Sequence, residues 1–93
     1  MNFDEIDMKI LEENFDKEMI NQINMDNISE IFKYLNESGI YYLKDLFLTS
    51  LDLFLLPSNE FINKFEKLKD KLGNDYVDKL GEDSSLIEIM YNV

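Results

Sequence analysis

The sequence contains no cysteine, histidine, arginine or alanine. Without cysteine the chain can form neither a disulfide nor a thiolate metal site, so nothing indicates an oxidising compartment. Without histidine it lacks the commonest general base and the commonest transition-metal ligand. The serines stand near expected turns and helix starts, where capping explains them. We therefore expect a protein that is not an enzyme and that has no cofactor and no metal.

Proline occurs once and glycine three times, and no stretch alternates apolar and polar residues over a strand's length. Both features favour helices. The predicted fold class is all-α: a small bundle of short helices with a helix-hairpin-helix-like core, an N-terminal helical arm and a C-terminal helix. In 93 residues this is one domain with an appended arm.

Helix signals place an acidic arm at 1–26 and the core with its C-terminal helix at 27–93. The apolar stripe of the arm slips near Asn14, which predicts a break there. Capping-box spacing predicts helix starts at Asn27 and at Ser85, and Ser58 or Asn59 is expected to cap the helix after Pro57. C-terminal caps are expected at Gly39, Gly73 and Gly81. Core helices are predicted at about 28–38, 43–48, 51–56, 59–72, 75–80 and 85–92.

Acidic residues outnumber basic ones by twenty to nine, which gives a formal net charge of −11. Such a field repels phosphate backbones and anionic membranes. There is neither a signal-peptide pattern nor an 18-residue apolar run, so we expect no membrane association and a cytoplasmic location. Abundant Asn, Ile and Lys without Ala fit an AT-rich genome, such as that of a low-GC bacterium or its phages and plasmids.

One segment stands out against this acidic background. Between Tyr41 and Leu56, eleven of sixteen residues are apolar. Left in water, these side chains would be an aggregation hazard, because burying one leucine is worth about 1.5–3 kcal/mol. Either the arm or the C-terminal helix covers them, or part of the segment is a docking surface or homodimer seam. The candidate apolar patch consists of Tyr41, Leu48, Leu51, Leu53 and Leu56.

From position 27 to 73, an amphipathic helix, a Gly-Ile turn, two short helices and a long helix follow one another. This order resembles the helix-hairpin-helix domain at the C-terminus of the bacterial RNA polymerase alpha subunit, over about half the chain. The residues that carry the resemblance are Leu35, Gly39, Ile40, Tyr42, Leu43, Asp45, Leu46, Phe54, Leu55, Asn59, Leu68 and Leu72.

The resemblance implies the fold but not the family's DNA contact. The family's hairpin carries a glycine that lets the backbone approach phosphate. In this sequence Phe61 stands in its place, and Glu30 corresponds to an arginine that helps to read DNA. A direct nucleic-acid binder nevertheless remains the alternative function. Its contacts would be Ser58, Lys64, Lys67 and Lys71.

The arm suggests a different function. Its carboxylates are spaced every few ångströms, on the length scale of a phosphate row. A protein that displays such a row can occupy the nucleic-acid site of a basic partner, as phage DNA mimics do. We therefore expect a non-catalytic protein-interaction module, a regulator or inhibitor of a nucleic-acid-handling protein, with an antitoxin or immunity-like protein as a further alternative. The acidic surface consists of Asp4, Glu5, Asp7, Glu12, Glu13, Asp16 and Glu18.

Overall fold

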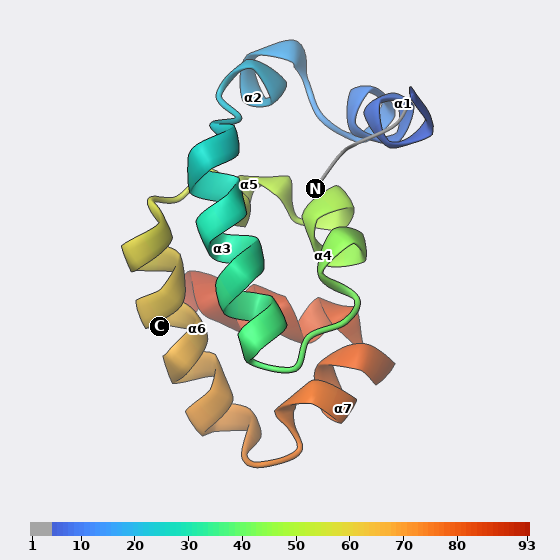
Figure 1. Ribbon diagram of the computed structural model, residues 1–93. Helices are drawn as coiled ribbons and strands as arrows, with labels where there is room; N and C mark the ends of the chain where they lie inside the picture. The colour runs from blue at the N-terminus through green and yellow to red at the C-terminus, as the bar shows by residue number, and fades with distance from the viewer. Residues whose placement is uncertain (1–4) are drawn as a thin grey trace.

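The computed structural model describes residues 5–93, which form helices joined by short loops, contain no strand and confirm the predicted all-α class (Figure 1). The predicted break near Asn14 is also confirmed, because the arm forms two helices. In chain order the elements are α1 (Glu5–Asn14), α2 (Lys17–Asn21), α3 (Met25–Glu37), α4 (Leu43–Thr49), α5 (Leu51–Phe54), α6 (Ser58–Leu72), α7 (Tyr76–Glu82) and the 3-10 helix η1 (Ser84–Asn92).

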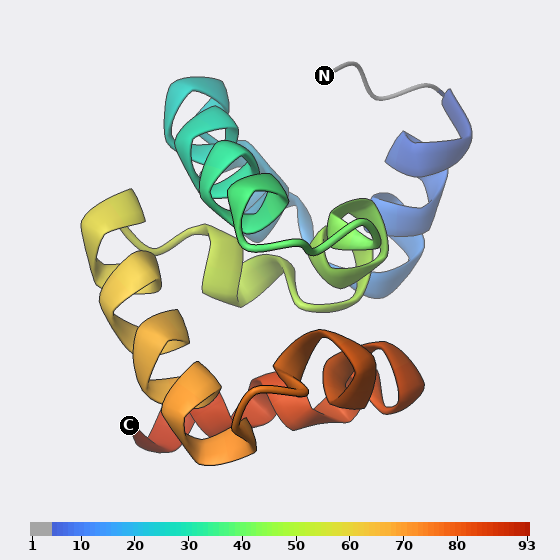
Figure 2. The same ribbon diagram turned by 60° about the horizontal axis from the view of Figure 1, so that its bottom comes forward.

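Helices pack both against neighbours in the chain and against helices that are distant in sequence. Helix α3 lies against α6, α1 lies against α4, and η1 contacts both α6 and α7. In Figure 2, α7 and η1 lie together below the pair formed by α3 and α4. The last helix is a 3-10 helix, and its three residues per turn bring the buried Ile87 and Met90 to the same side.

Aromatic rings fill the centre of the molecule. The ring of Phe54 lies with its centroid 5.1 Å from Phe61, 5.4 Å from Phe47 and 5.8 Å from Phe32. These four rings come from α3, α4, α5 and α6, so one aromatic cluster joins all four helices. Each edge-to-face pair adds about 0.5–1.5 kcal/mol beyond the burial of its area.

The chain itself covers the apolar segment. Leu51, Leu53 and Leu48 are 0%, 2% and 8% exposed. Leu11 of α1 and Met90 of η1 belong to the same core cluster, so the arm and the C-terminal helix both take part in the covering. The prediction of a docking patch is therefore wrong for Leu48, Leu51 and Leu53, because their side chains are packed inside the domain.

Several predicted helix caps are wrong in detail. Helix α3 begins two residues before Asn27, and Asn24 caps it by accepting hydrogen bonds from two backbone amides of the first turn. Neither Ser58 nor Asn59 caps α6, whose N-cap position is Pro57. The start of η1 is capped by Asp83 rather than Ser85, and Gly81 lies within α7.

Asn27 has a different role from the predicted cap. Its Nδ2 donates to the carbonyl oxygen of Leu56 at 2.7 Å, and its Oδ1 accepts from the backbone amide of Ser58 at 2.8 Å. One side chain on α3 therefore satisfies two backbone groups in the turn between α5 and α6. This double hydrogen bond holds the start of α6 against α3.

Candidate protein-interaction surface

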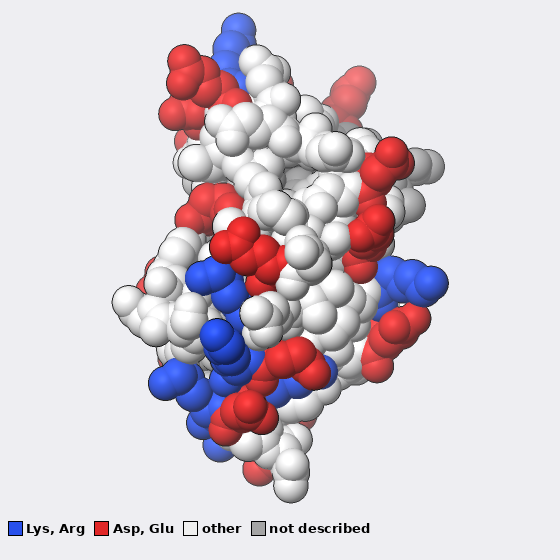
Figure 3. Space-filling view, turned by 90° about the vertical axis from the view of Figure 1, so that its left-hand side faces the viewer, with Lys and Arg blue, Asp and Glu red and all other residues white. Residues whose placement is uncertain are grey.

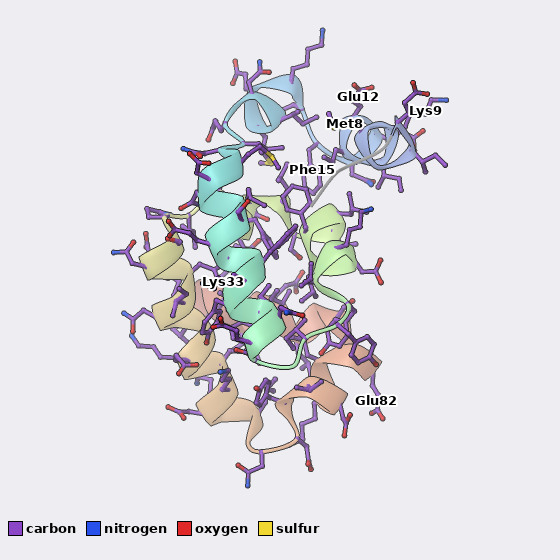
Figure 4. All side chains as sticks on the ribbon, in the orientation of Figure 1. Met8, Lys9, Glu12, Phe15, Lys33 and Glu82 are labelled. Carbon is purple, nitrogen blue, oxygen red and sulfur yellow. The ribbon has the colours of Figure 1, made fainter. Side chains whose placement is uncertain are left out.

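The acidic arm presents its described carboxylates to solvent. Glu5, Glu12, Glu13 and Glu18 are exposed, and Asp16 is exposed but also caps α2 through the amide of Met19. Asp4 lies outside the described residues, and so does the side chain of Asp7, whose backbone is in α1. In Figure 4, Glu12 and Lys9 point away from the body of the molecule while Phe15 points towards it.

The acidic row is not straight. Glu5 and Glu12 are two turns apart on α1, about 10 Å along one face of the helix. The chain then leaves α1 at Asn14, and α2 runs in another direction (Figure 1). The arm therefore displays a bent acidic surface and not a continuous row of about 20 residues.

Negative charge extends over the rest of the described surface. Every described Asp and Glu side chain is exposed except that of Asp52, which is half-buried. On the face that carries α6, Lys side chains gather in the lower half, with acidic side chains among them and above them (Figure 3). Carboxylates thus lie among the lysines of α6 that were predicted as alternative nucleic-acid contacts.

The lysines of α6 have different surroundings. Lys64, which is half-buried, donates from Nζ to the carbonyl oxygen of Val93 at 3.3 Å. Lys67 and Lys71 are exposed. Lys69 pairs with Glu66, with Nζ 2.8 Å from Oε2, and lies over the ring of Tyr34. Of the predicted nucleic-acid contacts on this helix, only Lys67 and Lys71 have ammonium groups that reach solvent without a described partner.

Lys69 joins a small network with two neighbours. Burial lowers its pKa, but hydrogen bonds with Glu66 and Tyr34 outweigh burial and leave the pKa raised. The hydrogen bonds from Lys69 and then from Tyr34 lower the pKa of Glu66. Burial, followed by the hydrogen bond to Glu66, raises the pKa of Tyr34 to about 12. The network ties α6 to α3 and keeps this ammonium group away from a ligand.

The chain's own side chains occupy the start of α6, where the resemblance would place the DNA-binding hairpin. The backbone amide of Ser58 donates to Asn27, and its hydroxyl donates to Glu30 at 2.5 Å. A phosphate bound at this helix start would need free amides and positive charge. It would instead meet the carboxylates of Glu30 and Glu60, both of which are exposed.

Tyr41 remains exposed, in contrast to the leucines of the predicted patch. Its side chain is 83% exposed and packs edge-on against Tyr42, with ring centroids 4.9 Å apart. Tyr42 donates its hydroxyl hydrogen to the carbonyl oxygen of Val77 at 2.6 Å. Burial, with the nearby charges of Tyr41 and Asp78, raises the pKa of Tyr42 to about 12. Leu56 is half-buried and, like Tyr41, still reaches the surface.

A pocket that the sequence did not indicate lies where α5, α6 and η1 meet. It has a volume of about 140 Å³. Tyr91 on η1 donates its hydroxyl hydrogen to Asp52 on α5, and burial followed by this hydrogen bond raises the pKa of Tyr91. Only the fold brings these two residues, 39 positions apart, together. The lining residues are Asp52, Leu53, Leu56, Glu60, Lys64, Met90 and Tyr91.

Residues 5–93 contain neither a candidate metal cluster nor a helix that could span a membrane. No group of three or more Asp, Glu, His or Cys side chains is arranged to hold a metal ion within that range. No helix there has both the length and the apolar character needed to cross a bilayer. In comparisons with known proteins, no family model, no curated protein and no solved structure matches the chain.

Proposed function

We propose that the protein is a non-catalytic interaction module whose acidic surface binds the basic, nucleic-acid-binding surface of a partner protein and so regulates or inhibits that partner. The observation that supports this function is the charge of the described surface. Every described carboxylate except that of Asp52 is exposed, whereas several ammonium groups are engaged by the chain's own atoms.

Some lysines are held in place by the chain's own atoms, although their ammonium groups keep their charge. Lys64 and Lys79 donate to backbone carbonyls, and Lys69 is held by Glu66 and Tyr34. A basic partner therefore meets a surface on which exposed carboxylates outnumber exposed ammonium groups. Complementary charge of this kind raises association rates and favours basic partners over acidic ones.

The hydrogen bonds and charges at the start of α6 favour this function over direct nucleic-acid binding. The amide and the hydroxyl of Ser58 are both used within the chain, and Glu30 and Glu60 flank the start of α6. Bringing a phosphate to this position would place like charges side by side. The exposed Lys67 and Lys71 alone provide too little positive charge to offset a net charge of −11.

Affinity capture from the cells that carry the gene tests the proposal. The captured protein should be basic, excess duplex DNA should displace it, and binding should weaken steeply as salt rises from about 50 to about 500 mM. The same duplex should show no mobility shift with this protein alone. A clear shift, or capture that neither DNA nor salt affects, would contradict the proposal.

Charge-reversal variants identify the surface that binds. In one variant Glu12, Glu13 and Glu18 become Lys; in the matched control Asp78 and Glu82 of α7 become Lys, together with Glu88 of η1. All six side chains are exposed, and Glu12 and Glu82 lie at opposite ends of the molecule (Figure 4). Binding through the arm predicts that only the first variant loses the partner. Equal losses would indicate that net charge matters and the arm does not.

A further inference from the structure

The pocket between α5, α6 and η1 is large enough for one side chain. Its volume of about 140 Å³ is close to that of an apolar cavity of roughly 150 Å³ that holds benzene. Sites for drug-sized ligands or nucleotides span about 300–1,000 Å³. The pocket is therefore the right size for a single side chain of a partner.

The pocket has an apolar floor and a charged rim. Leu56 and the ring of Tyr91 supply accessible apolar surface, and the buried Leu53 and Met90 form the floor beneath them. Asp52 and Glu60 are the two carboxylates of the lining. A ligand that fits must combine an apolar stem with a polar end.

The charge of the pocket lining determines whether the polar end of the ligand should be positive or negative. Asp52 is the half-buried carboxylate among the described acids, and neither it nor Glu60 has a cationic partner among residues 5–93. Lys64 also lines the pocket, but its ammonium group donates to the carbonyl of Val93 and not to either carboxylate. Two carboxylates and one ammonium group give the lining a formal charge of −1, so a cation completes it.

We propose that this pocket receives an arginine side chain of the basic partner. The inference rests on the proposed function and identifies one contact within it. The methylene stem would pack on Leu56 and the ring of Tyr91, above the buried Leu53 and Met90. The guanidinium group would donate to the lone pairs of Asp52 that Tyr91 leaves free, because an ionised carboxylate accepts about four hydrogen bonds.

Arginine fits better than lysine for two reasons. A guanidinium group is planar and donates in parallel to a carboxylate, whereas an ammonium group is a compact and more strongly hydrated charge. Guanidinium groups also stack on aromatic rings, and Tyr91 supplies a ring in the lining beside Asp52. Because a guanidinium group is more weakly hydrated than an ammonium group, the desolvation cost of entering the pocket would be smaller for arginine than for lysine.

Titration with short capped peptides tests the proposal on the whole protein. The probe is a Gly-Arg-Gly peptide with blocked ends, and its matched control carries citrulline, which has nearly the same shape but no charge. Methyl resonances of Leu53, Leu56 and Met90 should shift in a saturable manner with the arginine peptide. The citrulline peptide should bind at least about ten-fold more weakly, since charged hydrogen bonds are worth about 1.5–3 kcal/mol. Equal binding of both peptides would overturn the proposal.

Further probes address other ligands. The same peptide with lysine should bind more weakly than the arginine peptide. Sodium acetate should neither shift these methyl resonances nor compete, because the proposed ligand is a cation. Free L-arginine should bind no more tightly than the capped peptide. Acetate competition through Lys64, or tighter binding of free arginine, would assign the pocket to a small metabolite and overturn its assignment to a partner's side chain.

Variants that each remove one carboxylate charge show which residue binds the arginine peptide. Asp52→Asn keeps the shape of the side chain and an acceptor for Tyr91, and it should weaken the arginine peptide by about ten-fold. Asp45→Asn is the matched control, because Asp45 also lies in the first turn of a short helix but is exposed and outside the pocket. Glu60→Gln on the exposed rim gives a second test that does not disturb the interior. Equal effects of the Asp52 and Asp45 variants would overturn the proposal.

The pocket and the proposed function can fail separately. If Asp52→Asn captures the basic partner as well as the unaltered protein does, while the arm variant captures none, the pocket inference is wrong and the proposed function stands. If the arginine peptide binds the pocket but no basic protein is captured, the proposed function is wrong.

Discussion

Replacing Asn27 by alanine should strongly destabilise the protein, because its side chain satisfies two backbone groups at once. Nδ2 is 2.7 Å from the carbonyl oxygen of Leu56, and Oδ1 is 2.8 Å from the amide nitrogen of Ser58. Asn27→Ala leaves both groups without this partner. A buried unsatisfied group costs about 1–3 kcal/mol. The turn is only partly buried, so we expect the free energy of unfolding to fall by about 2–3 kcal/mol.

Urea unfolding followed by far-ultraviolet circular dichroism measures this loss. The midpoint should fall while the m-value stays unchanged, and the thermal midpoint should drop by about 10 °C. Asn36→Ala is the matched control, because Asn36 is an exposed asparagine on the same helix, and its change should stay within about 0.5 kcal/mol. If Asn27→Ala cost no more than Asn36→Ala, the double hydrogen bond would not hold the turn.

A double-mutant cycle measures the hydrogen bond between the amide of residue 58 and Asn27 separately from the other bond that Asn27 makes. Starting from Ser58→Ala, replacing this alanine by proline removes the amide hydrogen at the first position of α6, where proline is otherwise well tolerated. With Asn27 present, this change should cost about 1 kcal/mol. With Asn27→Ala it should cost nothing. A coupling energy below about 0.5 kcal/mol would mean that the two groups do not interact.

Three other predictions follow from the backbone, the tyrosines and the core. Gly73 has φ +85° and ψ −166°, a region nearly restricted to glycine, so Gly73→Ala should destabilise by about 1–3 kcal/mol in urea unfolding although no atom lies within 4 Å of the added Cβ. The pKa values of Tyr34 and Tyr42 are raised from 10.0 to about 12, so the folded state keeps protons that the unfolded state has lost. Their contribution to the free energy of unfolding should be fully present below pH 10 and lost as the pH rises through 12. In the Tyr42→Phe variant, the urea midpoint should therefore fall less between pH 10 and pH 12 than in the unaltered protein. Leu51 is fully buried, so Leu51→Ala should cost about 2–5 kcal/mol in the same assay, whereas a change below about 1 kcal/mol would show that it is not core.

Much of the architecture could be read from local patterns. The break of the arm at Asn14 follows from the slip of its apolar stripe, and α6 follows from apolar residues at helical spacing. Local patterns failed at helix ends. Asn27 has the spacing of a capping box but faces the turn before α6, because packing of α3 against α6 brings that turn within reach of its side chain.

The candidate site was predicted less well. The exposed carboxylates of the arm could be identified, since acidic side chains on an amphipathic helix face water. The apolar patch could not, because whether Leu48 or Leu53 is covered depends on contacts with distant segments. No pattern in the sequence predicted the pocket, because its carboxylate Asp52 and its tyrosine Tyr91 are 39 residues apart.

The sequence by itself determined the helical class, the order of the helices and the excess of negative charge, because these depend on residue type and on spacing over a few residues. Tertiary structure alone decided which leucines of the predicted apolar patch are buried, which lysines donate to backbone carbonyls and where a half-buried carboxylate meets an apolar pocket. These properties depend on atoms brought together from remote parts of the chain, and no local pattern records such distances.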